Sequence, residues 1–232
     1  MSYSKKHKVL LQAIIQEGAL SEYEGKKLVL ELFGHDHIAK VLNDINIKLQ
    51  LLNMTIKCVN CEVTGNLYWI LASTVQEKSA NFPLEFSQAQ LELLRNIYSE
   101  IITSNTGKVS STWCLNLCST LNHRLTKTEA EEFLQLLVNR KWLFYKNGKY
   151  YIGVRSIAEL QQYFKDTYDD NFTTCILCKQ SLYYGAKCDS CDTTTHVYCL
   201  KAYMRNSKLG CPNCHSAMPG ITYSDDTNSL QN

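Results

Sequence analysis

The chain of 232 residues has no long hydrophobic run and no excess of charge of one sign. A membrane-spanning helix needs roughly 18–20 consecutive apolar residues, and no stretch of this sequence is that long. The 24 Lys and Arg residues are balanced by 22 Asp and Glu residues along the chain, which leaves no basic block that would bind nucleic acid by charge alone. No cleavable leader is evident near Lys8. These absences predict a soluble intracellular protein that contacts no membrane.

Cysteine is abundant by contrast, with 11 residues, and seven of them lie with one His between residues 175 and 214. Zinc prefers thiolate and imidazole ligands, and four such groups close a structural site that leaves no position for a catalytic water. Close pairs at this spacing indicate metal binding rather than a disulfide framework. Eight ligands therefore predict two zinc ions, and consecutive pairs in such modules usually interleave. The expected ligands are Cys175, Cys178, His196 and Cys199 for the first ion, and Cys188, Cys191, Cys211 and Cys214 for the second.

The other four cysteines form two close pairs that we interpret as reduced thiols without metal. Cys58 and Cys61 have C-x2-C spacing but lie in a predicted strand, where an offset of three points the side chains to opposite faces. Cys114 and Cys118 are four residues apart on a predicted helix, one above the other. They are most simply core residues.

Residues 1–170 repeat one plan of three helices followed by a hairpin. In the first copy, apolar spacing predicts helices over 10–18, 21–33 and 38–49 and strands over 54–61 and 67–72. In the second copy, it predicts helices over 91–106, 110–118 and 128–139, strands over 142–145 and 149–152, and a last helix over 157–168. The Asn147-Gly148 turn of the second hairpin is among the strongest hairpin signals. This plan is typical of tandem winged-helix domains.

The charges do not favour DNA binding by these winged helices. A recognition helix carries side chains to phosphates and base edges, but the candidate in the second copy begins with Glu129, Glu131 and Glu132. The basic residues lie around the hairpin instead, for example Lys146 and Lys149. They form either a solvated face or a weak nucleic-acid contact through the wing. We therefore expect protein-docking surfaces, with DNA bound at most weakly or through a complex.

The ligand order of four Cys, one His and three Cys resembles two families, the histone-reading PHD finger and the RING finger of ubiquitin ligases. PHD fingers place a Trp two residues before the seventh ligand, where this chain has Leu209. RING fingers favour C-P-x-C as the last pair, as in residues 211–214, and an aliphatic residue before the second ligand, as at Leu177. The module thus resembles a RING more than a PHD finger. Tyr183 and Tyr184 could form a methyl-lysine cage, but we expect them to pack beside the metals.

Taken together, the chain resembles the non-SMC element one family, the RING subunit of the SMC five–six complex of chromosome maintenance and DNA repair. The segments 175–178, 188–191 and 195–200 carry the resemblance, and the helical copies support it. The resemblance implies docking on a MAGE-family subunit alongside a kleisin-like subunit. It also implies a location in the nucleus, on the chromosome.

The resemblance implies an activity without a catalytic nucleophile. A RING binds a ubiquitin-conjugating enzyme and positions the attached ubiquitin for attack by a lysine. Ile176, Leu177 and Pro212 are the expected contact residues, although Leu177 could instead pack against the zinc loops. His215 stands where active RINGs commonly have Arg or Lys, so we expect a ligase that is weak alone and stimulated by its partner. A non-catalytic assembly module is the alternative, and a PHD-like histone reader is a more distant one.

The expected fold is of the α+β class, with tandem winged-helix domains followed by a small two-zinc cross-brace RING-like domain. The predicted organisation is winged-helix domain A at 1–78, a linker at 79–87, winged-helix domain B at 88–170, a variant RING-type zinc finger at 171–219 and a disordered tail at 220–232.

Overall fold

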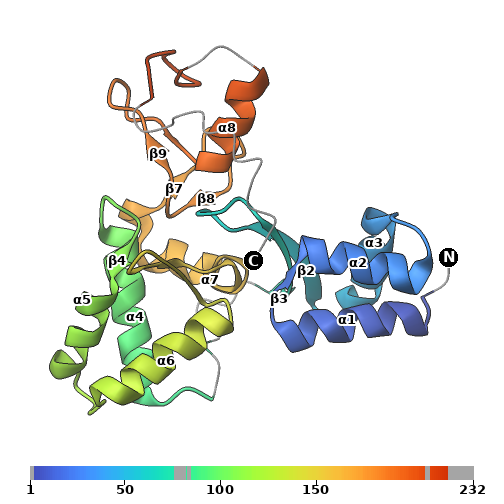
Figure 1. Ribbon diagram of the computed structural model, residues 1–232, viewed down its shortest axis with the longest axis horizontal. Coiled ribbons are helices and arrows are strands. Elements are labelled where there is room, and N and C mark those ends of the chain that lie inside the picture. Colours follow the sequence, from blue (N-terminus) through green and yellow to red (C-terminus); the bar gives the residue numbers. More distant parts are fainter. Residues whose placement is uncertain (1–2, 76–81, 83–84, 207–209, 219–232) are drawn as a thin grey trace.

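A computed structural model describes residues 3–75, 82, 85–206 and 210–218 of the chain. Figure 1 shows three parts, which we call the first half (3–75), the second half (82–167) and the C-terminal module (173–218). The C-terminal module sits above the two halves, which lie side by side. No helix within the described ranges combines the length and the apolar character needed to cross a membrane.

The first half is a three-helix bundle backed by a small antiparallel sheet. Its helices are α1 (Lys5–Glu17), α2 (Glu22–Phe33) and α3 (Ile38–Leu49), followed by a 3-10 turn η1 (Gln50–Leu52). Its strands are β1 (Leu20–Ser21), β2 (Met54–Asn60) and β3 (Leu67–Ser73), in the order β1-β3-β2. The Ser21 hydroxyl caps α2 by accepting a hydrogen bond from the Glu24 N–H at 3.2 Å. Gly34, in the left-handed region with φ 72°, ends that helix.

The second half repeats this order of elements. Its helices are α4 (Gln88–Thr103), α5 (Ser111–Asn116), the 3-10 turn η2 (Leu117–Thr120), α6 (Lys127–Asn139) and the added α7 (Val154–Thr167). Its strands are β4 (Val109–Ser110), β5 (Leu143–Lys146) and β6 (Lys149–Ile152), in the order β4-β6-β5. Asn147 and Gly148 both have positive φ, at 51° and 73°, which suits the type I′ turn of a two-residue hairpin.

The predicted mixed helix–strand fold is confirmed, and the structure adds three details. The two-residue strands β1 and β4, each directly before a helix, complete the two sheets. Helix α7 begins three residues before its predicted start. Phe82 and Phe86, expected in a linker, are instead buried in the core of the second half. Most of the predicted linker and the whole predicted tail at 220–232 lie outside the described residues.

A separate apolar cluster joins the two halves. Helix α7 of the second half packs on β2 and β3 of the first. The cluster is built from small and medium side chains, which let the backbones approach closely: Ala19, Cys61, Ile70, Ala72, Val154 and Ala158. Beside it, the Lys57 ammonium donates a hydrogen bond to the Ala158 carbonyl at 2.8 Å. The two halves therefore share a buried interface and are not independent units connected only by the chain.

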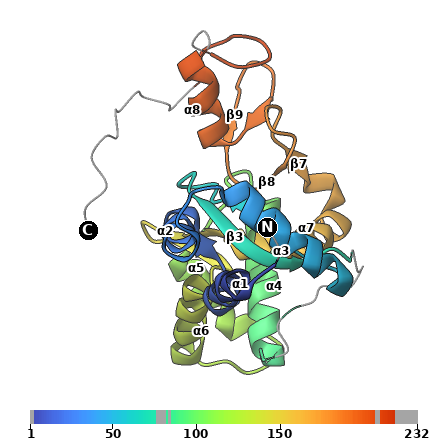
Figure 2. The ribbon, with the colours of Figure 1, turned by 90° about the vertical axis from the view of Figure 1, so that its right-hand side faces the viewer.

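The C-terminal module consists mainly of short strands and turns, with one helix. After a 3-10 turn η3 (Asp169–Asn171), its strands are β7 (Thr173–Thr174), β8 (Ser181–Leu182), β9 (Ala186–Lys187) and β10 (Thr194–Thr195), followed by α8 (Val197–Asn206). The strands pair as β7 with β8 and β9 with β10. Figure 2 shows the module projecting above both halves. The apolar core of this module is too small to stabilise the fold without additional cross-links such as disulfides or bound metal ions.

Candidate metal centres

Three turns of the same geometry carry the three C-x2-C pairs of the module. The residue after each second Cys has a left-handed backbone, with φ of 60° at Lys179, 57° at Asp192 and 59° at His215. In each turn, the N–H of that residue donates to the carbonyl of the first Cys, at 2.8, 2.9 and 3.0 Å respectively. The N–H of the first Cys in turn donates to a carbonyl two residues beyond the second Cys. Each pair thus presents two thiols from one tight turn.

The remaining ligand pair, the third along the chain, lies at the start of α8. His196 directly precedes the helix and Cys199 lies in its first turn. The Nδ1 atom of His196 is 3.3 Å from the Cys178 sulfur and 3.8 Å from the Cys199 sulfur. Cys175 completes this cluster, and the ligand atoms of all four residues lie within 4.8 Å of one another. We call it the His-containing cluster.

The second cluster consists of four cysteines, and its ligand atoms are separated by similar distances. The Cys188 and Cys214 sulfurs are 3.6 Å apart, as are those of Cys191 and Cys211. Tetrahedral zinc, with Zn–S near 2.3 Å and Zn–N near 2.0 Å, separates its ligand atoms by about 3.5–3.8 Å. The two clusters therefore fit two zinc ions. Their pairs interleave along the chain, the first with the third and the second with the fourth, in a cross-brace.

At Cys175 and Cys191, two of the eight ligands, hydrogen bonds to sulfur favour the thiolate form that zinc requires. Burial raises the pKa of the Cys175 thiol, but N–H groups of Cys178, His196 and Leu177 outweigh it and lower that pKa to about 7. The His196 N–H lies 3.4 Å from the Cys175 sulfur. In the second cluster, hydrogen bonds from Thr193 lower the pKa of Cys191 to about 6. A lower thiol pKa leaves a smaller proton cost when a metal binds.

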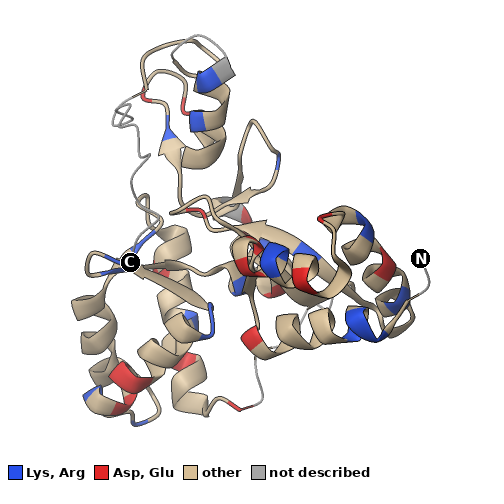
Figure 3. Ribbon diagram, turned by 45° about the vertical axis from the view of Figure 1, so that its right-hand side comes forward, with Lys and Arg blue, Asp and Glu red and all other residues tan. Residues whose placement is uncertain are grey.

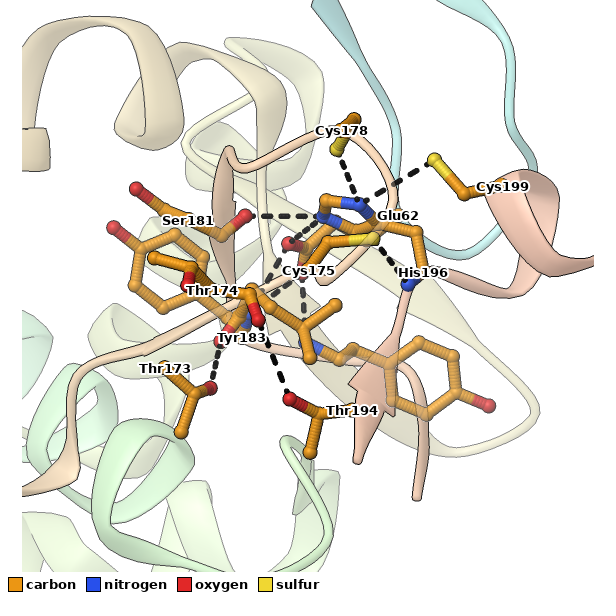
Figure 4. Close-up of polar contacts among 12 residues, drawn as sticks. Glu62, Thr173, Thr174, Cys175, Cys178, Ser181, Tyr183, Thr194, His196 and Cys199 are labelled. Carbon is orange, nitrogen blue, oxygen red and sulfur yellow. Dashed lines mark hydrogen bonds and ion pairs between the residues drawn. The ribbon is translucent and has the colours of Figure 1, made fainter. Parts of the chain in front are cut away.

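A buried carboxylate from the first half reaches the His-containing cluster. Glu62, in the loop between β2 and β3, is 4% exposed, and its Oε1 atom is 3.1 Å from His196 Nε2. Figure 4 shows Glu62 beside the ring edge opposite the cysteines, where the Ser181 carbonyl also faces Nε2 at 3.0 Å. Burial lowers the pKa of His196, but the contact with Glu62 outweighs it and raises that pKa to about 9. No motif or spacing in the sequence points to this residue.

Of the four cysteines outside the module, three are buried in apolar cores and one is exposed. Cys58 is exposed on β2, while Cys61, just past the strand end, is buried in the joint between the halves. Cys114 and Cys118 are both buried in the core of the second half. Burial raises the pKa of the Cys114 thiol to about 12, which suits an inert core residue. Neither pair belongs to a metal-binding cluster among the described residues.

The predicted conjugating-enzyme contacts lie on the turns that hold the ligands. Ile176 and Leu177 lie between Cys175 and Cys178 and are partly exposed, as is Pro212, at the corresponding position of the last turn. His215 is exposed, and the turn fixes its backbone in the left-handed region. These residues are accessible without any movement of the fold.

The rings of Tyr183 and Tyr184 pack on the second half, and not in the core of the module as we expected. The Tyr183 ring meets Phe164 of α7 with centroids 5.5 Å apart, and Tyr184 meets Tyr151 of β6 at 4.9 Å. Both rings thus contact the second half, because they extend from a loop that lies between it and the module. No aromatic cage is formed by this pair.

Similarity to known proteins extends over nearly the whole chain. A family model for a RING-like domain matches residues 175–214, and one for the Nse1 non-SMC component of the SMC5-6 complex matches residues 7–117. The chain is 32% identical over 222 residues to the non-structural maintenance of chromosomes element 1 homolog of Homo sapiens, covering 92% of this chain and 84% of that protein. It is 25% identical over 222 residues to element 1 of Schizosaccharomyces pombe, covering 94% of each.

The fold is also similar to that of a solved relative. A chain in the structure of an Nse1-Nse3-Nse4 complex superposes with a TM-score of 0.81 at 29% identity, covering 96% of this chain and 100% of that one. Full-length similarity in sequence and fold, together with the two zinc-binding clusters of a RING-like domain, shows that the chain belongs to the Nse1 family, the non-SMC component of the SMC5-6 complex.

Proposed function

We propose that the chain is a RING-type ubiquitin ligase subunit of an SMC5-6 complex, acting in DNA repair and chromosome maintenance in the nucleus. The observation that carries this proposal is the cross-braced pair of zinc-ligand clusters within residues matching a RING-like domain. In this proposal, Cys175, Cys178, His196 and Cys199 hold one zinc, and the four cysteines of the second cluster hold the other. We also propose domains at 1–78, 88–170 and 171–219, with Phe82 and Phe86 of the preceding segment packed into the core of the second domain.

The ligase activity that we propose is one of positioning. The module offers a partly exposed apolar surface at Ile176, Leu177 and Pro212, which would bind a ubiquitin-conjugating enzyme together with α8. His215 follows the last ligand, and its short side chain reaches less far than Arg or Lys would at this position. We therefore infer a weak ligase that depends on a partner to restrain the conjugated ubiquitin for attack.

The two winged-helix halves are proposed to dock on a MAGE-family subunit, next to a kleisin-like subunit. The similar solved chain belongs to an Nse1-Nse3-Nse4 complex, which supports partners of the Nse3 and Nse4 kind. Leu51 and Leu52, in the turn η1 that follows α3, are 85% and 70% exposed, and Ile47 on α3 is 51% exposed. Exposed apolar side chains grouped in this way are typical of protein interfaces.

Charge supports protein docking over DNA binding. Figure 3 shows Lys and Arg interspersed with Asp and Glu over the helices of the first half. In the second half, Glu129 is held by the Thr126 cap and Arg140 pairs with Glu85 at 3.9 Å. Because Glu129 and Glu85 are acidic and Arg140 is paired, these side chains do not form a basic face of the kind that binds phosphates. We infer that DNA is bound at most weakly, or through the complex.

A ubiquitin-transfer assay on the reconstituted complex tests the ligase proposal. The chain, co-purified with its MAGE-family subunit, is assayed with a panel of conjugating enzymes, and zinc content is measured in parallel. Leu177→Ala is expected to reduce transfer at least tenfold with two zinc ions retained. Lys187→Ala, an exposed site on β9 of the same module, is the matched control and is expected to transfer normally.

A non-catalytic assembly module is the second candidate, and His215 is the observation that favours it. In that case, transfer is absent across the panel even with the MAGE-family subunit present, or it is unaffected by Leu177→Ala. Assembly of the complex is then the function to be measured, by co-purification of the subunits. Transfer that requires Leu177 excludes this alternative.

A further inference from the structure

We propose that Glu62 is a positioning residue for the His-containing zinc cluster, supplied by the winged-helix part of the chain. Glu62 is 134 residues away from His196 in sequence, yet its carboxylate touches the imidazole of this ligand. The contact fixes the ring so that Nδ1 faces the metal, and it fastens the module to the first half. Metal binding and the orientation of the module are thereby coupled. The inference uses the zinc ligation proposed above for His196, but not ubiquitin transfer.

Hydrogen-bond partners define the imidazole tautomer. Nε2 of His196 faces two oxygens, Glu62 Oε1 at 3.1 Å and the Ser181 carbonyl at 3.0 Å. A carbonyl oxygen can only accept, so Nε2 must carry the proton and donate. When the ring is neutral, as metal binding requires, the lone pair then belongs to Nδ1, the atom that lies 3.3 Å from the Cys178 sulfur. A neutral imidazole with Nδ1 free is the form that coordinates zinc.

The carboxylate is itself held by the module it supports. Glu62 accepts hydrogen bonds from the Tyr184 N–H at 2.7 Å and from the Tyr183 N–H at 3.0 Å. Three donors therefore converge on one carboxylate that is 4% exposed. Without the carboxylate, the two backbone N–H groups would lose their partner in a buried site, which is costly. Glu62 thus connects a ligand side chain and the loop after β8 to the first half.

The loop that presents Glu62 has the hydrogen-bond pattern of the zinc-ligand turns. Cys61 N–H donates to the Asn66 carbonyl at 2.8 Å, and Gly65 N–H donates to the Cys61 carbonyl at 2.7 Å. Gly65 has a φ of 80°, and a Cβ there would lie 3.0 Å from that of Tyr198, the residue two after His196. A rigid turn in close contact with the module holds the carboxylate at a defined position.

Zinc affinity and release measure this role directly. Carboxylates that orient a histidine ligand typically contribute about 10–100-fold in metal affinity. In the full-length chain with two zinc ions, Glu62→Ala is expected to release one ion to a chelator about 10–100-fold faster, with the other unchanged. Glu62→Gln keeps the shape but turns an NH2 group toward an N–H donor or the imidazole, so its release rate is expected to be intermediate. Glu31→Gln, an exposed site on α2, is the matched control.

Two spectroscopic readouts separate positioning from general loss of folding. After replacement of zinc by cadmium-113, the NMR resonance of the His-containing site is expected to shift in Glu62→Gln, while that of the four-cysteine site stays in place. Imidazole nitrogen-15 shifts are expected to show the Nε2-protonated form in the parent chain. Hydrogen exchange completes the test. Because coupling is reciprocal, removal of zinc should in turn accelerate amide hydrogen exchange at residues 61–66.

Each outcome decides the inference. The inference is overturned if each zinc ion is released at the same rate from the parent chain, Glu62→Gln and Glu62→Ala. A cadmium spectrum that is the same in all variants also overturns it. Equal acceleration of both ions in Glu62→Gln assigns the residue to general folding and also overturns it. A parent chain that binds no zinc would refute the proposed ligation instead, which is a different result.

Discussion

The joint between the two halves predicts a large effect of one substitution, Ile70→Ala. Ile70 lies on β3, is 0% exposed and packs in one cluster with Val154 and Ala158 of α7. The change removes three buried carbons, or about 2.4 kcal/mol at ~0.8 kcal/mol per methylene. The cavity that remains brings the expected loss of stability to about 2–5 kcal/mol. Because the cluster is shared, both halves should be affected.

Hydrogen exchange with mass spectrometry is the assay, on the zinc-loaded chain. Peptides from β3 and from α7 are both expected to lose protection in Ile70→Ala, although the substitution lies in the first half only. Ile15→Ala is the matched control, because the same change is made at a site on α1 that is 54% exposed. It is expected to alter stability by less than about 0.5 kcal/mol.

Two hydrogen-exchange results would contradict a core shared by the two halves. Unchanged protection of α7 in Ile70→Ala, with protection lost only in β3, would mean that the two halves do not share a core. A loss below about 1 kcal/mol on β3 itself would contradict the burial of the side chain.

Three other substitutions give separate expectations. Cys58→Ser should leave two zinc ions per chain by atomic emission, since this exposed thiol lies outside both clusters; a loss of metal would make it a ligand. Gly25→Ala should lower the thermal midpoint, although alanine favours a helix by about 1 kcal/mol, because its methyl would overlap the Trp69 ring; a higher midpoint would contradict this packing. Hydrogen bonds from Asn122 and His123 lower the pKa of Glu92 from 4.5 to about 2, so the carboxylate stabilises the folded chain above pH 4.5 and this contribution disappears as the pH falls through about 2. Glu92→Gln should accelerate hydrogen exchange at residues 120–124 at pH 7, and exchange equal to that of the parent chain would contradict it.

Local rules predicted most of the helices and strands. Ser21 and Gly34 define the ends of α2 because a cap and a left-handed residue act within one turn of the chain. The Asn147-Gly148 turn fixed the second hairpin for the same reason. Strands β1 and β4 escaped prediction because two residues are too few to show a periodicity. They exist because a sheet edge is nearby in space.

The zinc chemistry and the family could both be predicted from the amino-acid sequence. Ligand type and spacing predicted two ions, because C-x2-C pairs form local turns that present two thiols together. The way in which the three parts are joined is seen in the folded chain and could not be predicted. The pairing of Glu62 with His196, the packing of Tyr183 on Phe164 and the joint around Ile70 each link distant segments. No periodicity or motif in the sequence predicts such contacts. They form when the surfaces of distant segments pack together and bury polar and apolar groups.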